Sequence, residues 1–463
     1  MKKTIVLVLA AALVAQTVTG CSGGGSTGKA GGAGTSAAET TTAAAAASTA
    51  AGETTKAEDM ASKYEVTEPI TIEWWHTLEE QYSDTVNEIV DGFNKSQDMI
   101  TVVPQYAGNA TKINEDLVAA NAAGTGLPAI TVANTSYVTD YGAGGLMEDL
   151  TPYIEATGYD TTDFGDGMIE ASKYDGKLVS LPFLISTQIM FYNKDMAKEM
   201  NITIPEKWED MDAFLEKATK KNADGTTDVY GTVIASWDQW YFETFYLNQG
   251  VKIINDDQLT TDLGDEKAVA IAEKIKEWTD NQYIGWAAGT DAASNMRQQF
   301  IGGKTFSIVH TSSVYNTYVN QCDFEVGMAW LPGGETKNQE IGGVVVMIPS
   351  KNDQATKNAA WQFMQYLCSK DVNMQWATGT GYMPTRKSVL NTDEGKAFLE
   401  MKPAFQAIFD NLDLIKPRIV HKNWNQLATI WKNSMAEVIG EGGDVKKAME
   451  QMAEEINEVL GDS

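Results

Sequence analysis

The stretch from Leu178 to Asp195 reads Leu-Val-Ser-Leu-Pro-Phe-Leu-Ile-Ser-Thr-Gln-Ile-Met-Phe-Tyr-Asn-Lys-Asp. Its mostly apolar part is longer than an ordinary strand. Because Pro182 has no N–H to donate to a central ladder, we predict two short strands joined where Pro182 breaks the pairing. The hydroxyls of Ser186 and Thr187, if buried, need partners from the backbone or from a bound polar ligand. The stretch therefore predicts a buried segment that crosses the fold.

The first twenty residues have the pattern of a secretory signal. Lys2 and Lys3 precede an apolar run from Ile5 to Val18 that is too short and wrongly flanked for a spanning helix. Small residues directly precede Cys21, which resembles the lipobox of bacterial lipoproteins. We expect a lipid on Cys21; the alternative is an unmodified signal peptide with a stray cysteine. Residues 21–66, rich in Gly, Ala, Thr and Ser, are then the lipidated cysteine and a disordered tether.

Composition excludes some functions. The chain has 463 residues, enough for two or three domains, and its net charge of −28 makes nucleic acid an unlikely partner. After Cys21, only Cys322 and Cys368 remain, which do not make a disulfide framework. Both lie in apolar settings, so we expect buried free thiols, and the sequence leaves open whether they pair.

The body begins with strands that alternate with helices. We expect strands at 70–75, 100–104 and 129–132, and helices at 83–94 and 112–123. This alternation predicts a parallel-rich α/β sheet whose ligand edge is at the carboxyl ends of the strands. Trp75 and His76 lie at one such end, and Asn134 and Thr135 at another.

The pattern continues after the crossing segment. We expect helices at 205–220, 265–278 and 355–368, and strands at 229–235, 305–309, 324–331 and 341–348. The strand at 305–309 runs into His310-Thr311-Ser312-Ser313, a second apolar strand that ends in hydroxyls.

Several short motifs recur in a characteristic order. They are Trp-Trp-His at 74–76, Gly-Phe-Asn at 92–94, Leu-Pro-Ala-Ile at 127–130, Phe-Tyr-Asn-Lys-Asp at 191–195, Pro-x-x-Trp at 205–208, Phe-x-x-Gly-Lys at 300–304, Ile-Gly-Gly at 341–343 and Thr-Gly-Tyr-Met-Pro at 380–384. Their order resembles the family 1 extracellular solute-binding proteins of ABC importers, closest to the branch that binds sn-glycerol 3-phosphate and its diesters, beside the maltose-type sugar binders.

The resemblance implies a type II periplasmic-binding-protein fold: two discontinuous α/β lobes joined by a hinge, with the ligand cleft between them. We expect an N-terminal lobe from residues 67–181 plus 314–370 and a C-terminal lobe from 182–313 plus 371–463. Leu178 to Asp195 and Ile308 to Ser313 would be two of the crossovers. Closure at the hinge would present the bound form to the membrane permease.

Candidate ligand contacts follow from the resemblance and from carbohydrate chemistry, which pairs aromatic platforms with amides, carboxylates and hydroxyls. The candidates are Trp75, His76, Glu79, Asn134, Ser186, Trp208, Trp237, Trp240, Ser312, Gly342, Gly343, Tyr382 and Arg418. For each Trp and for Tyr382 the alternative is core packing, and for Gly342-Gly343 it is a bulge for close strand packing.

Arg418 aligns with an arginine that grips phosphate in the glycerol-phosphate branch, although sugar binders of the family often have Pro-Arg here too. A guanidinium fork suits phosphate or carboxylate. Where that branch has a ligand-contacting tyrosine and glutamate, this chain has Ala110 and Asn134. These two departures weaken the glycerol-phosphate interpretation and leave room for a neutral sugar or oligosaccharide.

We expect no enzyme activity, no cofactor and no metal. His76 and Glu79, three residues apart, suit ligand hydrogen bonding or loop anchoring better than catalysis, and the three histidines have no metal-ligand spacing. The prediction is a monomeric lipoprotein on the outer face of the cell membrane, in a Gram-positive cell from its tether composition, that delivers solute to an ABC permease. The alternatives are a secreted carbohydrate-active enzyme working through two carboxylates, or a surface sensor or adhesin.

Overall fold

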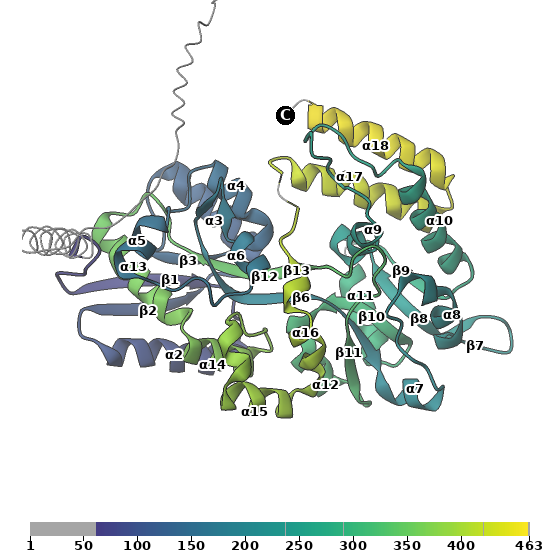
Figure 1. The fold of residues 1–463 in the computed structure, drawn as a ribbon, viewed down its shortest axis with the longest axis horizontal. Helices are drawn as coiled ribbons and strands as arrows, with labels where there is room; N and C mark the ends of the chain where they lie inside the picture. The colour runs from purple at the N-terminus through teal and green to yellow at the C-terminus, as the bar shows by residue number, and fades with distance from the viewer. Residues whose placement is uncertain (1–61, 237, 290, 420, 462–463) are drawn as a thin grey trace, which may run out of the picture. The chain divides into compact units, whose positions relative to one another are not determined.

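The computed structural model describes residues 62–236, 238–289, 291–419 and 421–461 (Figure 1). The predicted signal peptide, Cys21 and most of the predicted tether lie outside this range. Tyr64 is buried against Tyr153, with 4.4 Å between ring centroids, and Asn358 Nδ2 donates to the carbonyls of Lys63 and Glu65 at 3.0 Å each. The last residues assigned to the tether therefore pack on the folded body. No helix within the described ranges is long and apolar enough to cross a membrane.

The first part of the body follows the predicted alternation of strands and helices. Its elements are β1 (Ile70–His76), α2 (Ser83–Ser96), β2 (Ile100–Tyr106), α3 (Ala110–Ala123) and β3 (Ile130–Asn134). β1 lies parallel to both β2 and β3, so all three carboxyl ends meet at one edge of the sheet. Helix α2 buries Val86, Ile89, Val90 and Phe93, which are spaced along one helical face.

The crossing segment is one strand, β6 (Leu181–Asn193), and the prediction of two short strands is wrong. Pro182 lies only one residue inside β6, opposite Val345, and the register shifts between Val344 and Val345 at this point. This bulge accommodates the missing N–H. The strand then continues through thirteen residues, twelve of them buried.

The strand order of the large sheet is β2-β1-β3-β12-β6-β10-β8-β7. β12 (Gln339–Met347) runs antiparallel to β3 and β6, and β10 (Thr305–Thr311) runs antiparallel to β6 and parallel to β8 (Thr227–Ala235). The α/β prediction is confirmed, with antiparallel pairs at the centre and parallel pairs on both sides.

The described residues form two hydrophobic cores. The first contains β1 to β3, α2 and α13 (Gln354–Leu367), and the second contains β8, β10, α10 (Glu266–Asp280), α17 (Trp424–Ala436) and α18 (Val445–Gly461). β6 and β12 pass from one core to the other, since Leu184 and Val344 belong to the first core and Ile185 and Ile341 to the second.

The expected crossover at Ile308 to Ser313 is wrong, because the chain packs in the second core on both sides of it, at Val309 and at Tyr315. β12 takes this role instead. Tyr315, Tyr318 and Val326 also pack in the second core, whereas the sequence placed residues 314–370 in the first lobe. The cores favour a boundary near residue 342, and the lobe boundaries stay a prediction.

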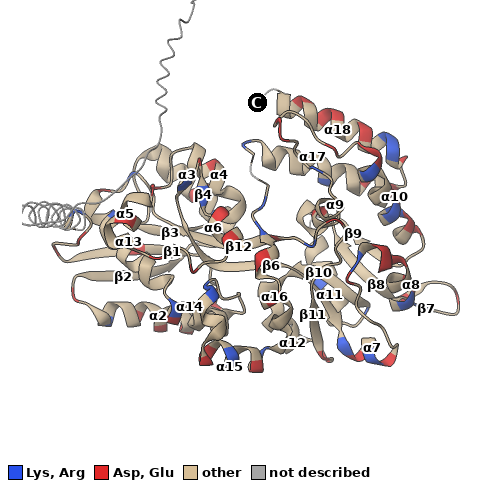
Figure 2. Cartoon of the chain, in the orientation of Figure 1, with Lys and Arg blue, Asp and Glu red and all other residues tan. Residues whose placement is uncertain are grey.

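Charged residues of both signs alternate along the helices that cover the second core. Figure 2 shows Lys and Arg interspersed with Asp and Glu on α10 and α18. Pairs such as Lys276–Asp280, with 2.7 Å between Nζ and Oδ2, are spaced one helical turn apart. These exposed pairs contribute little to stability individually.

Candidate functional site

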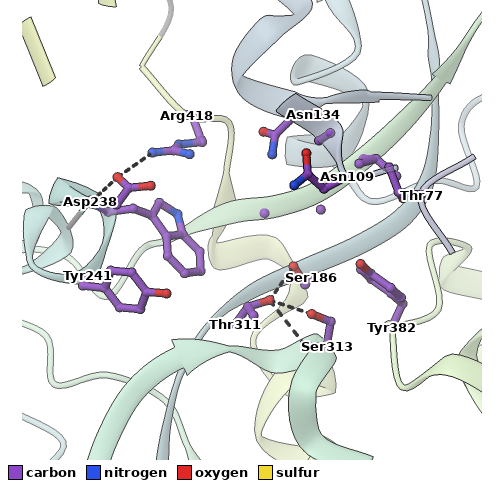
Figure 3. Close-up of a pocket in the computed structure, with 15 residues that line it drawn as sticks. Thr77, Asn109, Asn134, Ser186, Asp238, Tyr241, Thr311, Ser313, Tyr382 and Arg418 are labelled. Carbon is purple, nitrogen blue, oxygen red and sulfur yellow. Dashed lines mark hydrogen bonds and ion pairs between the residues drawn. The ribbon is translucent and has the colours of Figure 1, made fainter. Parts of the chain in front are cut away.

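A cavity of about 320 Å³ lies where the carboxyl ends of β1 and β3 meet the crossing strands (Figure 3). Its lining consists of Thr77, Asn109, Ala110, Asn134, Ser186, Asp238, Trp240, Tyr241, Thr311, Ser313, Gly342, Gly343, Val344, Tyr382 and Arg418. Hydroxyl, amide and aromatic groups predominate. They come from segments of both cores, so the cavity depends on how β6 and β12 join them.

Seven of the residues predicted from the sequence line this cavity: Asn134, Ser186, Trp240, Gly342, Gly343, Tyr382 and Arg418. Trp75, His76, Glu79, Trp208 and Ser312 lie outside the lining, and Trp237 lies outside the described residues.

Local packing explains why three of these residues lie outside the cavity lining. His76 is buried, its Nδ1 accepts from Leu78 N at 3.2 Å, and burial lowers its pKa to about 4. Trp208 packs beside Trp278, 5.1 Å between ring centroids. The Ser312 hydroxyl is buried and accepts from Thr187 N at 3.1 Å. Each polar group already has a partner or a packing role.

The sequence analysis did not single out Thr77, Asn109, Asp238, Tyr241 or Val344. Two of them carry a recognisable signal. Asn109 and Asp238 are N-cap residues, a position that Asn and Asp favour. An Asn or Asp placed just after a strand and just before a helix would have identified both.

Asn109 and Asn134 present amide donors to the cavity. Asn109 Oδ1 accepts from Lys112 N at 2.9 Å, and Asn134 Oδ1 accepts from Ser136 N at 3.0 Å. Because each oxygen caps its own helix, the Nδ2 group is the part of each side chain that remains to donate to a ligand. Figure 3 shows both side chains at the same side of the cavity.

A group of hydroxyls lies opposite these amides. Thr311 Oγ1 donates to Ser186 Oγ at 2.9 Å and lies 2.9 Å from Ser313 Oγ. Burial raises the pKa of Tyr382 to about 12, and its hydroxyl bonds to Ser313. All four groups are neutral at ordinary pH, and each can both donate and accept.

Trp240 contributes an aromatic ring to the lining of the cavity. The backbone carbonyl of Trp240 accepts from Gln188 Nε2, and its backbone N–H donates to Asp238 Oδ1 at 3.0 Å. A Cβ on Gly342 would come within 3.3 Å of Trp240 Cζ2 and 2.9 Å of Ser186 Oγ. The absence of a side chain at Gly342 therefore gives room to both the indole ring and the Ser186 hydroxyl.

Arg418 lies at the edge of the cavity among acidic groups. Its Nη2 is 3.8 Å from Asp238 Oδ1 and 3.5 Å from Glu243 Oε1. Its Cζ is 6.0 Å from the Trp240 ring centroid. Burial alone would lower the pKa of Arg418, but the nearby carboxylates of Glu243 and Asp238 raise it.

Two buried carboxyls lie behind Arg418. Glu243 and Glu340 are fully or almost fully buried, and Glu243 Oε1 lies 3.5 Å from Arg418 Nη2. Burial raises the pKa of both, and the charge of Glu243 raises that of Glu340 further. Burial therefore opposes ionisation of both carboxyls, the more so because Glu243 Oε1, Glu243 Oε2 and Glu340 Oε2 accept no hydrogen bond from the described residues.

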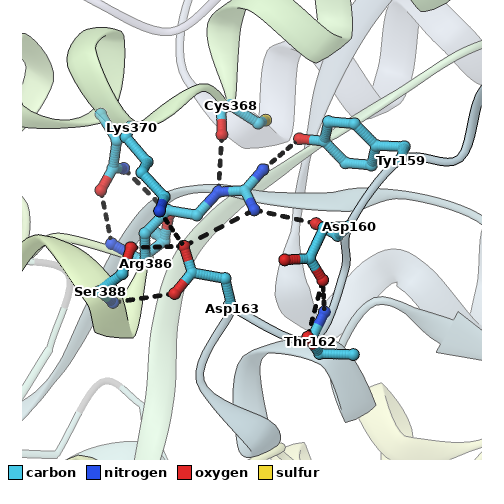
Figure 4. Close-up of polar contacts among 10 residues, drawn as sticks. Tyr159, Asp160, Thr162, Asp163, Cys368, Lys370, Arg386 and Ser388 are labelled. Carbon is cyan, nitrogen blue, oxygen red and sulfur yellow. Dashed lines mark hydrogen bonds and ion pairs between the residues drawn. The ribbon is translucent and has the colours of Figure 1, made fainter.

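The loop that carries Tyr382 is held by a buried polar network (Figure 4). Arg386 Nε donates to the Cys368 carbonyl and Nη1 to the Asp160 carbonyl, both at 2.9 Å, and Nη2 donates to Tyr159 Oη. Asn373 and Thr385 exchange two further bonds of 2.9 Å. The loop is thus fixed to the first core.

Both remaining cysteines are unpaired. Cys368 is buried in the first core and Cys322 packs partly buried against the second. Burial raises their pKa values to about 12 and about 11. No group of three or more His, Cys, Asp or Glu residues in the described part of the chain is placed to hold a metal ion.

The sheet order and the cavity between two cores define a type II periplasmic binding fold. Residues 88–407 match the family described as bacterial extracellular solute-binding protein. This chain belongs to that family, the solute-binding components of ABC importers.

Known relatives are distant. The sn-glycerol-3-phosphate-binding periplasmic protein UgpB of Pectobacterium atrosepticum is 24% identical over 353 residues, 72% of this chain and 77% of that protein. UgpB of Mycobacterium tuberculosis, solved with glycerophosphocholine, has a TM-score of 0.74 at 19% identity over 85% of this chain and 98% of its own. The sugar-binding protein MalE of Xanthomonas citri matches with the same TM-score, identity and coverage. These structures establish the likeness of fold.

Proposed function

We propose that this protein captures a carbohydrate, or glycerol phosphate, outside the cell membrane and delivers it to an ABC permease. The observation that carries the proposal is the combination in one cavity of an indole platform with amide and hydroxyl groups from both cores. Sugar rings present hydroxyls at their edges and C–H groups on their faces, and this lining complements both.

The relatives support the same ligand classes. The curated relatives are named for sn-glycerol 3-phosphate, and the solved structures include MalE of Xanthomonas citri and the GacH receptor of Streptomyces glaucescens with acarbose. At 25% identity or below, the ligand of a relative transfers only as a candidate.

The mode of action we propose is closure and release without chemistry. β6 and β12 connect the two cores, and a ligand that contacts Asn134 on one side and Trp240 on the other would stabilise a closed state. A lipid on Cys21 and a tether would hold a monomeric body near the permease on the outer face of the membrane of a Gram-positive cell.

Titration calorimetry tests the ligand assignment. The full chain, with Cys21→Ser to prevent lipidation, is titrated with monosaccharides, oligosaccharides, sn-glycerol 3-phosphate and glycerophosphocholine. Saturable binding that Trp240→Ala weakens, with the ligand recovered unchanged, is the expected result. Conversion of a bound sugar into products would instead identify a carbohydrate-active enzyme.

A further inference from the structure

The guanidinium of Arg418 is already surrounded by acceptors. Besides Asp238 and Glu243, the side-chain oxygen of Gln239 lies 3.2 Å from Nη2 when its amide is oriented to satisfy its neighbours. The Arg418 side chain is only 12% exposed, while that of Asp238 is 25% exposed. Both residues line the cavity, and of this ion pair the carboxylate side chain is the more exposed.

The acidic side chains around Arg418 outnumber it. Asp238 Oδ1 lies 3.8 Å and Glu243 Oε1 3.5 Å from its Nη2. Among the described residues that line the 320 Å³ cavity, Arg418 is the only Lys or Arg. A phosphate entering here would lose its hydration and meet a site in which two acidic side chains already surround the one cation.

We propose that Asp238 and Glu243 together exclude anionic ligands, so that the solute is an uncharged polyhydroxy compound and Arg418 is an internal counter-charge that orients Asp238. This inference rests on the proposed solute-binding function and narrows its ligand class. An ionised carboxylate accepts hydrogen bonds from ligand hydroxyls, and each such bond to a charged group is stronger than one between neutral groups. The carboxylate oxygens of Asp238 would then accept hydrogen bonds from ligand hydroxyls and repel a phosphate group.

A neighbouring cavity of about 330 Å³ shares Asn134, Asp238 and Arg418 with the first and adds Lys432 from α17. Lys432 is the one further cation among the described residues of this lining, so it is the place where an anion could be held if the proposal is wrong. The test therefore separates Arg418 from Lys432.

The experiment measures binding of sn-glycerol 3-phosphate and of glycerol, its uncharged counterpart, to the full Cys21→Ser chain. Asp238→Asn removes the exposed carboxylate while keeping its shape. Asp228→Asn is the matched control, because Asp228 loses the same charge but pairs with Lys304 outside the cavity. The unaltered chain and the control should show no saturation by glycerol 3-phosphate in the millimolar range. Asp238→Asn should bind it at least about tenfold more tightly, and a further Arg418→Ala change should abolish the gain.

Two results overturn the inference. One is micromolar binding of glycerol 3-phosphate by the unaltered chain. This result overturns the inference regardless of which substitution, Arg418→Ala or Lys432→Gln, abolishes the binding. The other is an Asp238→Asn variant that melts at the unaltered temperature and gains no affinity for the phosphate. Failure of every uncharged sugar to bind would instead count against the carbohydrate assignment, and the Asp238→Asn comparison would still decide whether Asp238 excludes anions.

Discussion

At the scale of single residues, Trp240 combines two functions: it closes one side of the cavity and it packs beside Tyr241, with 5.7 Å between ring centroids. Its backbone is fixed on both sides, by Gln188 at the carbonyl and by Asp238 at the N–H. An aromatic ring held in one orientation loses little conformational entropy on binding, which favours its use as a platform.

We expect Trp240→Ala to raise the dissociation constant for the ligand roughly thirtyfold, equivalent to about 2 kcal/mol, because a buried aromatic anchor is lost. Trp240→Phe, which keeps a smaller apolar ring, should cost less. Trp208→Phe is the control, since Trp208 packs against Phe245 and Trp278 outside the cavity. Calorimetric titration of the three variants measures the difference. Equal affinities in Trp240→Ala and Trp208→Phe would show that the platform lies elsewhere.

Whether a site residue could be predicted depended on whether a short stretch of sequence indicates its position in the fold. Asn134 and Ser186 were found because they follow or interrupt apolar runs, and the sheet brings such positions to one edge. Trp75 was a weaker inference, because alternation along β1 buries Trp74 and directs its neighbour to the other face of the sheet. The N-cap pattern at Asp238 indicates its place before a helix, but no local pattern reports its pairing with Arg418, 180 residues away in the sequence.

At the scale of elements, the contact between β6 and β12 determines whether the cavity forms. Gly343 has φ of 91°, and a Cβ at this position would lie 2.1 Å from the Leu184 carbonyl oxygen. Gly342 has ordinary backbone angles but would place its Cβ against Trp240 and Ser186. The two adjacent glycines thus serve different purposes, one for the strand pairing and one for the cavity.

Gly343→Ala should therefore destabilise the fold by about 2 kcal/mol or more, since it adds backbone strain and a clash with main-chain atoms that cannot move aside. Gly342→Ala should cost less stability but weaken ligand binding, because the Trp240 ring and the Ser186 hydroxyl must shift. Urea denaturation gives the first quantity and titration the second. The opposite ranking, with Gly342→Ala the less stable protein, would contradict this division of roles.

Arg386 has a comparable role for the loop that carries Tyr382. Its guanidinium donates to two carbonyls and to Tyr159, and it lies 3.9 Å from the Phe164 ring centroid. We expect Arg386→Ala to lower the free energy of unfolding by about 3–5 kcal/mol, because buried acceptors and Asp163 lose their charged partner. Arg386→Lys keeps the charge but not the fork, so it should recover only part of the loss. Thermal melting compares them, and full recovery by lysine would show that charge alone matters.

The elements themselves were largely predictable, whereas their junctions were not. The helix predicted at 83–94 and the strands predicted at 70–75 and 100–104 follow from periodicity within a single segment, and α2, β1 and β2 end one or two residues later than predicted. The continuity of β6 through Pro182 was not predictable from the segment alone. It depends on a register shift in β12, more than 160 residues further along the chain. The choice of crossover failed for the same reason, since strand pairing decides which apolar strand joins the two cores.

At the scale of the whole molecule, each core contains one buried histidine. His76 packs beside Trp74 of the first core, and His310 lies in β10 of the second, where its Nδ1 is 3.1 Å from Tyr318 Oη. Burial lowers the pKa of His76 to about 4 and that of His310 to about 3, with the Arg297 charge lowering the latter further. Both side chains are therefore neutral in the folded protein at ordinary pH.

A histidine with a depressed pKa in the folded state makes stability fall as the pH drops. The unfolded chain begins to take up a proton near pH 6.5, but the folded protein does so only near pH 4 for His76. Within that window the unfolded state binds more protons. Each histidine therefore lowers the free energy of unfolding by 1.36 kcal/mol per pH unit, about 2 kcal/mol by about pH 5.

Urea denaturation at about pH 7 and pH 5 should show this loss of stability in the unaltered chain. His76→Gln and His310→Gln should each recover about 2 kcal/mol of the difference between the two pH values. The buried Glu243–Glu340 pair responds in the opposite direction, but it is present in every variant and cancels in the comparison. Identical pH dependence in the variants and the unaltered chain would mean that neither core excludes the charged imidazole.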